Sequence, residues 1–367
     1  MSSQHMRQLG VQMHGVTLNL QCNYDKLLDH TACLLNGYTC PPWESPNLVV
    51  TGHWLTQPPQ DEPGPLAETA GLDGFGKRMH LSAEQLVWTD VYRVKELQLG
   101  FRRDGATVAF DVVYRYAPLA RNLARFPDYE EKKFFDLLRY LVLFPIAWHL
   151  ERTRGWVLVH ASAVATGDRA VLLAGPGGAG KSTTCVALAA RAGMTLVTEN
   201  LLFWDGAHIF PVIEPIRLTK ESLALIDADA AGLQPVSYRG GLKHKALFQF
   251  PVQPILPAVR PVVLFLPQFS SCGFVRRIPP GEAYELLAAT NRLTLELNDY
   301  YWYTAALDLL WPQPGNAQRQ LDVLQRLTDT TPCYTLGIDR SAGVGPVVDR
   351  VLQCLHESQD TVQVVTS

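Results

Sequence analysis

Val-Leu-Leu-Ala-Gly-Pro-Gly-Gly-Ala-Gly-Lys-Ser-Thr, residues 171–183, is the stretch of this 367-residue sequence that decides the fold. Gly175 and Gly180 frame four residues, and Lys181 and Ser182 follow directly. This spacing satisfies the G-x-x-x-x-G-K-[ST] pattern of a phosphate-binding loop. In such a loop, backbone N–H groups turn toward a polyphosphate, and the N-terminus of the next helix adds partial positive charge. The stretch therefore predicts that the chain binds a nucleoside triphosphate.

The sequence on either side of the loop supports this interpretation. The apolar run Ala170–Ala174 is typical of a buried strand, and the alanine-rich run Thr183–Arg191 predicts a helix. We expect Lys181 to reach the β- and γ-phosphates and the hydroxyl of Ser182 to bind Mg²⁺. The residues predicted to contact the phosphates of ATP in this segment are Gly175, Gly177, Gly178, Ala179, Gly180, Lys181, Ser182 and Thr183.

The overall composition is that of an ordinary folded protein, with 47% hydrophobic and 18% charged residues. A net charge of −3 gives no electrostatic reason to expect nucleic acid or an anionic membrane as a partner. The most apolar segment, Phe134–Leu150, contains Asp136, Arg139 and Pro145 and is short for a membrane span. It predicts a buried helix with a kink.

The seven cysteines are scattered and show no C-x-x-C spacing. A metal site at the nearest group, Cys22, Cys33 and Cys40, would need His30 or His53 as a further ligand. Reduced thiols in a cytosolic protein are the simpler interpretation. Residues 1–8 also lack the apolar core of a signal peptide, so we expect a cytoplasmic protein.

Strand-rich patterns before residue 125 predict an N-terminal β-rich α+β domain over 1–125, followed by a connecting helix over 126–154. Asp104-Gly105 predicts the turn of a β-hairpin, and the proline-rich segment Pro58–Leu66 predicts a surface loop. The elements predicted in this part are strands at Gly15–Cys22, Asn47–Leu55, Leu97–Arg102 and Thr107–Tyr116 and helices at Tyr24–Leu35 and Tyr129–Arg154.

Residues 155–367 alternate between strand and helix patterns, which predicts an α/β domain with a sheet flanked by helices and ligands at the strand ends. The elements predicted there, besides those of the loop, are strands at Val157–Val159, Thr195–Thr198 and Pro261–Leu266 and helices at Gly281–Thr290 and Pro346–Glu357.

A phosphotransferase also needs a metal anchor, a group that orients or deprotonates the acceptor, and positive charge for the transferring phosphoryl group. His160 and the pair Glu199-Asn200 each follow a predicted strand near the loop. Arg217 and the cluster Lys243-His244-Lys245 are candidate sources of positive charge.

These candidates also have structural interpretations. His160 could be a buried structural histidine, and Glu199-Asn200 could cap a turn. Glu214 and Arg217 could form an ordinary surface pair. The aromatic run Asp299–Tyr303 is more typical of a core or an interface than of a substrate platform.

Three runs together resemble the catalytic core of the HPr serine kinase/phosphorylase family: His160–Val164, Ala170–Thr183 and Leu196–Asn200. The likeness is greater to the HprK-like kinases of biosynthetic and peptide-modifying gene clusters than to the carbon-regulatory enzyme. The specific match covers Gly155–Leu218. The segment Gly241–Lys245 resembles a later basic segment of the family more weakly.

The resemblance implies a P-loop kinase core that uses ATP and Mg²⁺. It implies His160, Lys181 and Glu199 as catalytic residues, with Glu199 as the base for the acceptor hydroxyl. It further implies Lys243 as a phosphate contact. Mg²⁺ would be held by Ser182, Glu199 and Asn200. Because the family forms hexamers, the resemblance also implies a homo-oligomer.

The chain departs from the family at one pair of residues, where the usual Asp-Asp is replaced by Glu199-Asn200. Asparagine ligates Mg²⁺ weakly and brings no charge. The expected function is transfer of the γ-phosphoryl group of ATP to a hydroxyl, a serine of a peptide or small protein. The alternatives are a small-molecule kinase of a biosynthetic pathway and a catalytically weak nucleotide-binding regulatory module. The N-terminal domain would recognise the acceptor or mediate assembly.

Overall fold

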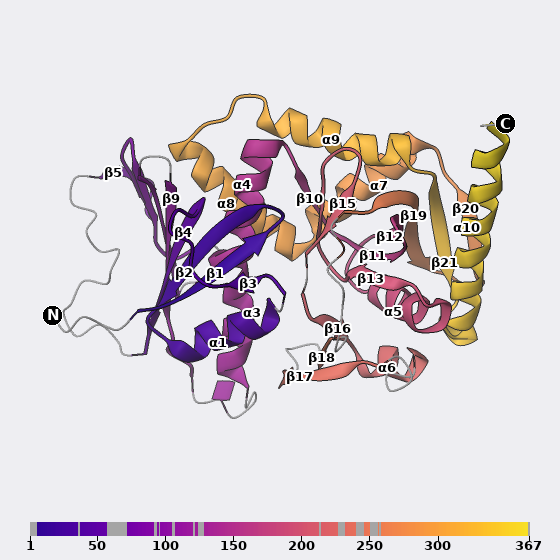
Figure 1. Cartoon of the computed structure of the whole chain (residues 1–367), viewed down its shortest axis with the longest axis horizontal. Coiled ribbons are helices and arrows are strands. Elements are labelled where there is room, and N and C mark those ends of the chain that lie inside the picture. The colour runs from indigo at the N-terminus through magenta and orange to yellow at the C-terminus, as the bar shows by residue number, and fades with distance from the viewer. Residues whose placement is uncertain are drawn as a thin grey trace. The chain divides into compact units, whose positions relative to one another are not determined.

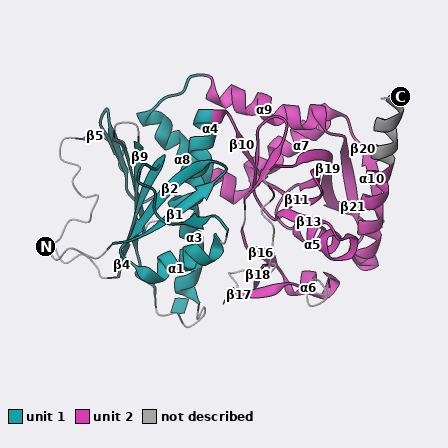
Figure 2. Ribbon diagram, viewed as in Figure 1, with its two compact units in different colours: residues 1–153, 299–314 teal, residues 154–298, 315–367 magenta. Residues whose placement is uncertain are grey.

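The computed structural model describes residues 6–35, 37–56, 72–91, 94, 96–104, 107–119, 122–123, 128–212, 214–226, 232–239, 246–249, 256 and 258–365 (Figure 1). The predicted loop Pro58–Leu66, the turn residues Gly105-Ala106 and the segment Gly241–Lys245 with Lys243 lie outside these residues. The chain divides into two compact units, one of residues 1–153 and 299–314 and the other of residues 154–298 and 315–367 (Figure 2).

The first unit contains a nine-stranded sheet with the order β3-β1-β2-β4-β9-β8-β7-β6-β5. Its strands are β1 Arg7–Met13, β2 Val16–Cys22, β3 Thr39–Cys40, β4 Leu48–Leu55, β5 Asp73–Phe75, β6 Met79–Leu81, β7 Gln85–Trp88, β8 Leu97–Asp104 and β9 Thr107–Arg115. Strand β4 runs parallel to both β2 and β9, and the other neighbours are antiparallel. The predicted strands and the hairpin of β8 and β9 are confirmed, as is the first helix, α1 Asp25–Leu34.

The predicted kinked helix is α3 Tyr129–Leu138, a π-helical turn η1 Arg139–Leu143 and α4 Phe144–Arg154. In the turn, the N–H of Phe144 donates to the carbonyl of Arg139, five residues earlier. Pro145 has no N–H, and its ring would clash with the carbonyl four residues before it in a regular helix. The wider turn directly before Pro145 therefore gives the predicted kink a physical cause.

The aromatic run Asp299–Tyr303 lies in helix α8 Leu295–Leu310, and its residues are assigned to the first unit. Tyr300 and Tyr303 are buried, and their ring centroids lie 5.4 Å and 5.5 Å from that of Phe144. This confirms the core interpretation for these two tyrosines. Their packing partners lie about 150 residues earlier in the chain, so the sequence pattern gave no indication that residues 299–314 join the first unit.

The second unit contains a six-stranded sheet with the order β13-β11-β12-β19-β21-β20. Its strands are β11 Ala161–Thr166, β12 Arg169–Ala174, β13 Thr195–Thr198, β19 Arg260–Phe269, β20 Phe274–Arg277 and β21 Cys333–Ile338. Strands β12, β19 and β21 are parallel, and the remaining pairs are antiparallel. Two three-stranded sheets accompany it: β10 Val157–Val159, β14 Leu202–Trp204 and β15 Ile209–Pro211 form one, and β16 Ile216–Leu218, β18 Ala246–Gln249 and β17 Gln234–Arg239 form the other.

Alternating side chains of β12 enter two separate hydrophobic cores. Val171 and Leu173 pack in the core that includes residues of α5 Lys181–Ala192 and α10 Gly345–Val365. Leu172 packs in the core that includes residues of α7 Pro280–Leu293 and α9 Asn316–Thr330. A strand exposes successive side chains on opposite faces, so the sheet lies between two layers of helices, which confirms the predicted mixed α/β arrangement.

Within the ranges given above, no helix is both long enough and apolar enough to cross a lipid bilayer.

We predict that Leu172→Ala lowers the free energy of unfolding by about 2–5 kcal/mol, because the leucine is fully buried on an interior strand. The matched control is Leu286→Ala on α7, whose side chain is 41% exposed and whose loss should cost about 0.5 kcal/mol or less. Urea unfolding followed by circular dichroism measures both values. Equal losses in the two variants would contradict the placement of β12 inside the sheet.

Candidate functional site

The glycine-rich loop connects β12 to α5, and its backbone requires glycine near the helix. Gly178 and Gly180 have φ angles of +85° and +93°, in the left-handed region that other residues rarely adopt. A Cβ atom at Gly180 would also lie 3.0 Å from Cδ1 of Ile338. Gly180 occupies the N-cap position of α5, and no described side chain caps the helix there. The first N–H groups of α5 point toward the N-terminal end of the helix, the direction from which an anion would approach.

Lys181 is 5% exposed, and its ammonium group folds back over the loop. Nζ donates to the main-chain oxygens of Gly175 at 2.9 Å and Pro176 at 3.1 Å. These carbonyl groups are neutral, so they satisfy the donors without cancelling the charge. The loop thus holds a positive charge close to the N-terminus of α5, which is a favourable place for an anion.

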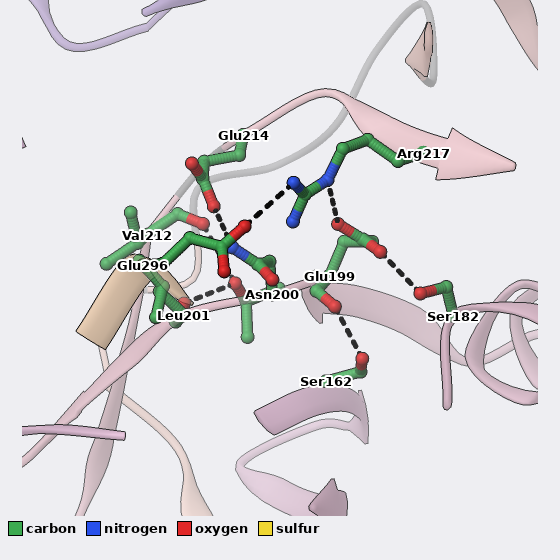
Figure 3. A network of polar contacts seen from close by, with 10 residues as sticks. Ser162, Ser182, Glu199, Asn200, Leu201, Val212, Glu214, Arg217 and Glu296 are labelled. Carbon is green, nitrogen blue, oxygen red and sulfur yellow. Dashed lines mark hydrogen bonds and ion pairs between the residues drawn. The ribbon is translucent and has the colours of Figure 1, made fainter. Parts of the chain in front are cut away.

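A carboxylate contacts the first turn of α5. The hydroxyl of Ser182 donates a hydrogen bond to Oε1 of Glu199, which directly follows β13 (Figure 3). The hydroxyl of Ser162, on β11, donates to the main-chain oxygen of Glu199 at 2.5 Å. The structure therefore brings Glu199, which follows a different predicted strand, to Ser182 of the loop motif, directly after Lys181.

Arg217, on β16, approaches the carboxylate oxygen of Glu199 that does not contact Ser182 (Figure 3). Its Nε is 3.8 Å from Oε2 of Glu199, and its Nη1 is 3.0 Å from Oε1 of Glu296. Burial opposes the charge of Arg217, but the carboxylates of Glu199, Glu214 and Glu296 outweigh it and raise the pKa of the guanidinium above its usual value. Arg217 therefore stays charged at the site.

Glu214 and Asn200 form a second polar contact in the same network. Nδ2 of Asn200 donates to Oε2 of Glu214 at 2.8 Å, and both residues are buried. The interpretation of Glu214 as one half of a surface pair is therefore wrong. The assignment of Asn200 to Mg²⁺ stays a prediction.

His160 lies at the break between β10 and β11 and is buried. Its backbone N–H donates to Oδ1 of Asn291 at 3.2 Å, and its Nδ1 is 2.9 Å from the hydroxyl oxygen of Thr294. That hydroxyl also lies 3.0 Å from the carbonyl oxygen of Thr290. A carbonyl can only accept, so both contacts are satisfied when Nδ1 carries the proton and donates to Thr294.

The charge state of His160 follows from its surroundings. Burial, and then the positive charge of Lys181, lower the pKa of His160 to about 3, against the opposing effect of Glu296. The imidazole is therefore neutral near pH 7, where it can exchange hydrogen bonds but adds no positive charge. These contacts also fit the structural interpretation of His160.

The segment that joins α7 to α8 contributes residues that the sequence patterns do not indicate. Asn291 and Thr294 contact His160, and Glu296 pairs with Arg217. The one available signal was the presence of polar residues within a segment otherwise rich in leucine. Their partners lie between 79 and 134 residues away, too far for a local pattern to indicate.

A cavity of about 260 Å³ opens beside the loop. Its lining includes the start of α5 from Lys181 to Thr184, together with Arg217. It also includes Phe269 and Ile338, from the ends of β19 and β21. The space next to the loop is therefore bounded by charged and apolar groups.

Possible metal ligands are dispersed over the described part of the chain. No group of three or more His, Cys, Asp or Glu side chains gathers there in an arrangement suited to a metal ion. The cysteines Cys22, Cys33 and Cys40 are free thiols. The pair that best matches the preference of Mg²⁺ for oxygen ligands is the hydroxyl of Ser182 with the carboxylate of Glu199.

Neither a scan of protein-family models nor a search of curated proteins finds a match for this chain.

We predict that His160 makes the folded state less stable in acid. Its pKa of about 3 lies below the value of about 6.5 for an unfolded chain, so protons bind preferentially to the unfolded state. The contribution of His160 is constant above about pH 6.5 and is lost as the pH falls toward 3, by about 1.4 kcal/mol per pH unit. When the pH falls from 6.5 to 4, the free energy of unfolding of His160→Gln should therefore decrease by about 2–3 kcal/mol less than that of the unsubstituted protein.

Urea unfolding at a series of pH values measures this difference. His356→Gln, at an exposed position of α10, is the control and should follow the unsubstituted protein. Identical pH dependence in His160→Gln and the unsubstituted protein would show that His160 is not held neutral by the fold.

Proposed function

We propose that this chain is an ATP- and Mg²⁺-dependent kinase with a P-loop core of HprK-like type. It would transfer the γ-phosphoryl group of ATP to a hydroxyl, a serine of a peptide or small protein. The observation that best supports the proposal is the hydrogen bond from Ser182 to Glu199 at the start of α5, directly after Lys181, whose ammonium group contacts the loop. A hydroxyl, a carboxylate and a cation at a helix N-terminus are the groups that a metal-bound triphosphate requires.

The proposal assigns the phosphates to residues 175–183 and to Lys181. The uncapped N-terminus of α5 and the buried ammonium group both favour an anion. To bind the β- and γ-phosphates, Nζ of Lys181 would exchange its contacts with two carbonyl oxygens for contacts with charged oxygens. The carbonyl oxygens are neutral, whereas the phosphate oxygens add the attraction between opposite charges, so this exchange is favourable.

The residues that would hold Mg²⁺ are Ser182 and Glu199, with Asn200 as a further predicted ligand. A hydroxyl and one carboxylate suit this ion, because in kinase sites Mg²⁺ typically uses one or two carboxylates together with substrate phosphates and water. When bound, Mg²⁺ neutralises charge on the β- and γ-phosphate oxygens.

Phosphoryl transfer would proceed as follows. The acceptor oxygen forms a bond to the γ-phosphorus, the bond from that phosphorus to the β-phosphate oxygen breaks, and ADP leaves. The hydroxyl proton passes to Glu199, and Arg217 supplies positive charge for the oxygens of the transferring group. His160, neutral near pH 7, would orient groups by hydrogen bonding.

A nucleotide-binding regulatory module is the second candidate. It is favoured by Asn200, whose side chain donates to Glu214 and brings no negative charge to Ser182. This candidate and the kinase predict the same nucleotide binding but different turnover. A small-molecule acceptor remains the alternative within the kinase class.

We predict that Lys181→Ala weakens ATP binding by about 30- to 800-fold, because a buried cation that contacts the phosphates contributes roughly 2–4 kcal/mol. Isothermal titration with Mg-ATP measures the affinity, and thermal unfolding checks that the variant folds. Lys132→Ala, at a lysine on α3 that pairs with Asp136, is the control. Unchanged affinity in Lys181→Ala would exclude the loop as the phosphate site.

We predict that Glu199→Gln retains ATP binding within a few-fold and lowers phosphoryl transfer by about 10²–10⁴-fold, as expected for loss of a general base. Transfer of label from γ-³²P-ATP to an array of serine-containing peptides measures it. Glu282→Gln, at an exposed position on α7, is the control. Full activity in Glu199→Gln would remove Glu199 from the mechanism. ATP binding by the unsubstituted protein without transfer to a peptide or to a panel of hydroxylated small molecules would favour the regulatory module.

A further inference from the structure

We infer that the cavity beside the loop holds the nucleobase of the bound nucleotide, stacked on the ring of Phe269. The inference rests on the proposed binding of a nucleoside triphosphate and adds the part of the site that recognises its base. Phe269 ends β19 and is 51% exposed, although it lines a cavity that begins at the phosphate loop. No sequence motif includes this residue.

The sheet order separates the two sides of the proposed site. Glu199 follows β13, which lies beyond β11 on one side of β12, whereas β19 and β21 lie on the other side. Because β12, β19 and β21 are parallel, the loop, Phe269 and Ile338 all lie at their carboxyl ends, along one edge of the sheet. A nucleotide with its terminal phosphate near Glu199 would extend its base toward β19 and β21.

The part of the cavity wall formed by Phe269 and Ile338 is in contact with the loop. A Cβ atom at Gly180 would lie 3.0 Å from Cδ1 of Ile338 and 3.9 Å from Cε1 of Phe269. The apolar wall therefore begins at the loop itself, without an intervening space. Val344, just before α10, and Val347, in its first turn, continue this lining.

A cation lies over the same aromatic ring. The guanidinium carbon of Arg340 is 5.1 Å from the centroid of Phe269, within the range of a cation–π interaction. A planar base can stack on an aromatic ring and on a guanidinium plane, and both residues line the cavity. Two π-stacking groups at one wall suit a nucleobase better than an aliphatic ligand.

Backbone contacts hold this wall in place before a ligand arrives. Phe269 pairs in register with Ile338, and the N–H of Ser270 donates to the carbonyl of Ile338 at 3.0 Å. The carboxylate of Asp339 accepts from the N–H and the hydroxyl of Ser341 at 2.9 Å and 2.6 Å, which fixes the short 3₁₀ turn η2 Arg340–Ala342. A preorganised wall loses less conformational entropy on binding.

Hydroxyl groups form a further part of the lining. The hydroxyl of Thr183 donates to that of Ser222 at 2.9 Å, and Thr219 lies 3.2 Å from the same oxygen. All three residues line the cavity, whose volume of about 260 Å³ is near the lower end for small-molecule sites. Hydroxyls near an apolar wall match the ribose and the base of a nucleoside.

The test compares Mg-ATP with inorganic tripolyphosphate, which carries the phosphates without a nucleoside, by isothermal titration. We expect the unsubstituted protein to bind ATP about 10- to 100-fold more tightly than tripolyphosphate, because one base–aromatic stack contributes this much. Phe269→Ala should bind ATP no more tightly than tripolyphosphate and should keep its affinity for tripolyphosphate. Phe269→Trp should retain the advantage. Phe75→Ala, at a phenylalanine of the other unit that is 53% exposed, is the matched control and should bind both as the unsubstituted protein does.

The outcomes separate this inference from the proposed function. If Phe269→Ala binds ATP as the unsubstituted protein does, or loses affinity for both compounds equally, the base subsite is wrong. If the unsubstituted protein binds both compounds with equal affinity, the base subsite is again wrong and the phosphate site stands. If the unsubstituted protein binds neither compound, the proposed function fails.

Discussion

The hydrogen bond between Ser182 and Glu199 is the interaction around which the rest of the site is arranged. It joins the first turn of α5, the helix that follows β12, to the end of β13, a strand that β11 separates from β12 in the sheet. Ser162 fixes the main chain of Glu199, and Arg217 approaches its second carboxylate oxygen. A buried carboxylate is costly unless it has such partners, so the position of Glu199 depends on all three contacts.

The need of buried charges for partners of opposite sign also explains the wider cluster of charged side chains. Glu199, Glu214 and Glu296 gather around Arg217, and all three carboxylates raise the pKa of its guanidinium. Removal of Arg217 would leave these carboxylates buried without its compensating charge, which typically costs more than an ion pair itself contributes. The cluster therefore behaves as a unit, and the effects of single substitutions within it will not add.

Local sequence patterns were sufficient to predict the elements that meet at the loop. Apolar residues at Ala170–Ala174, glycines with left-handed backbone and the helix after Lys181 all follow from rules that act over a few residues. The same rules could not predict that Glu296 pairs with Arg217, or that Thr294 contacts His160, because tertiary packing sets these contacts. The strand β11 was also missed, since its alanines and serine carry little strand signal. The pairing of Phe269 with Arg340 likewise depends on the register of β19 with β21.

The π-helical turn between α3 and α4 has a consequence for the rotational phase of the two helices. One additional residue in a turn rotates every later side chain by about 100° about the helix axis. The buried residues Phe144, Trp148 and Leu150 occupy their positions only with that offset. Because α4 is buried on almost every side, deletion of a single residue from Arg139–Leu143 would turn these side chains toward different neighbours within the core, even if the remaining residues were all apolar. The length of this segment is therefore more tightly restricted than its composition.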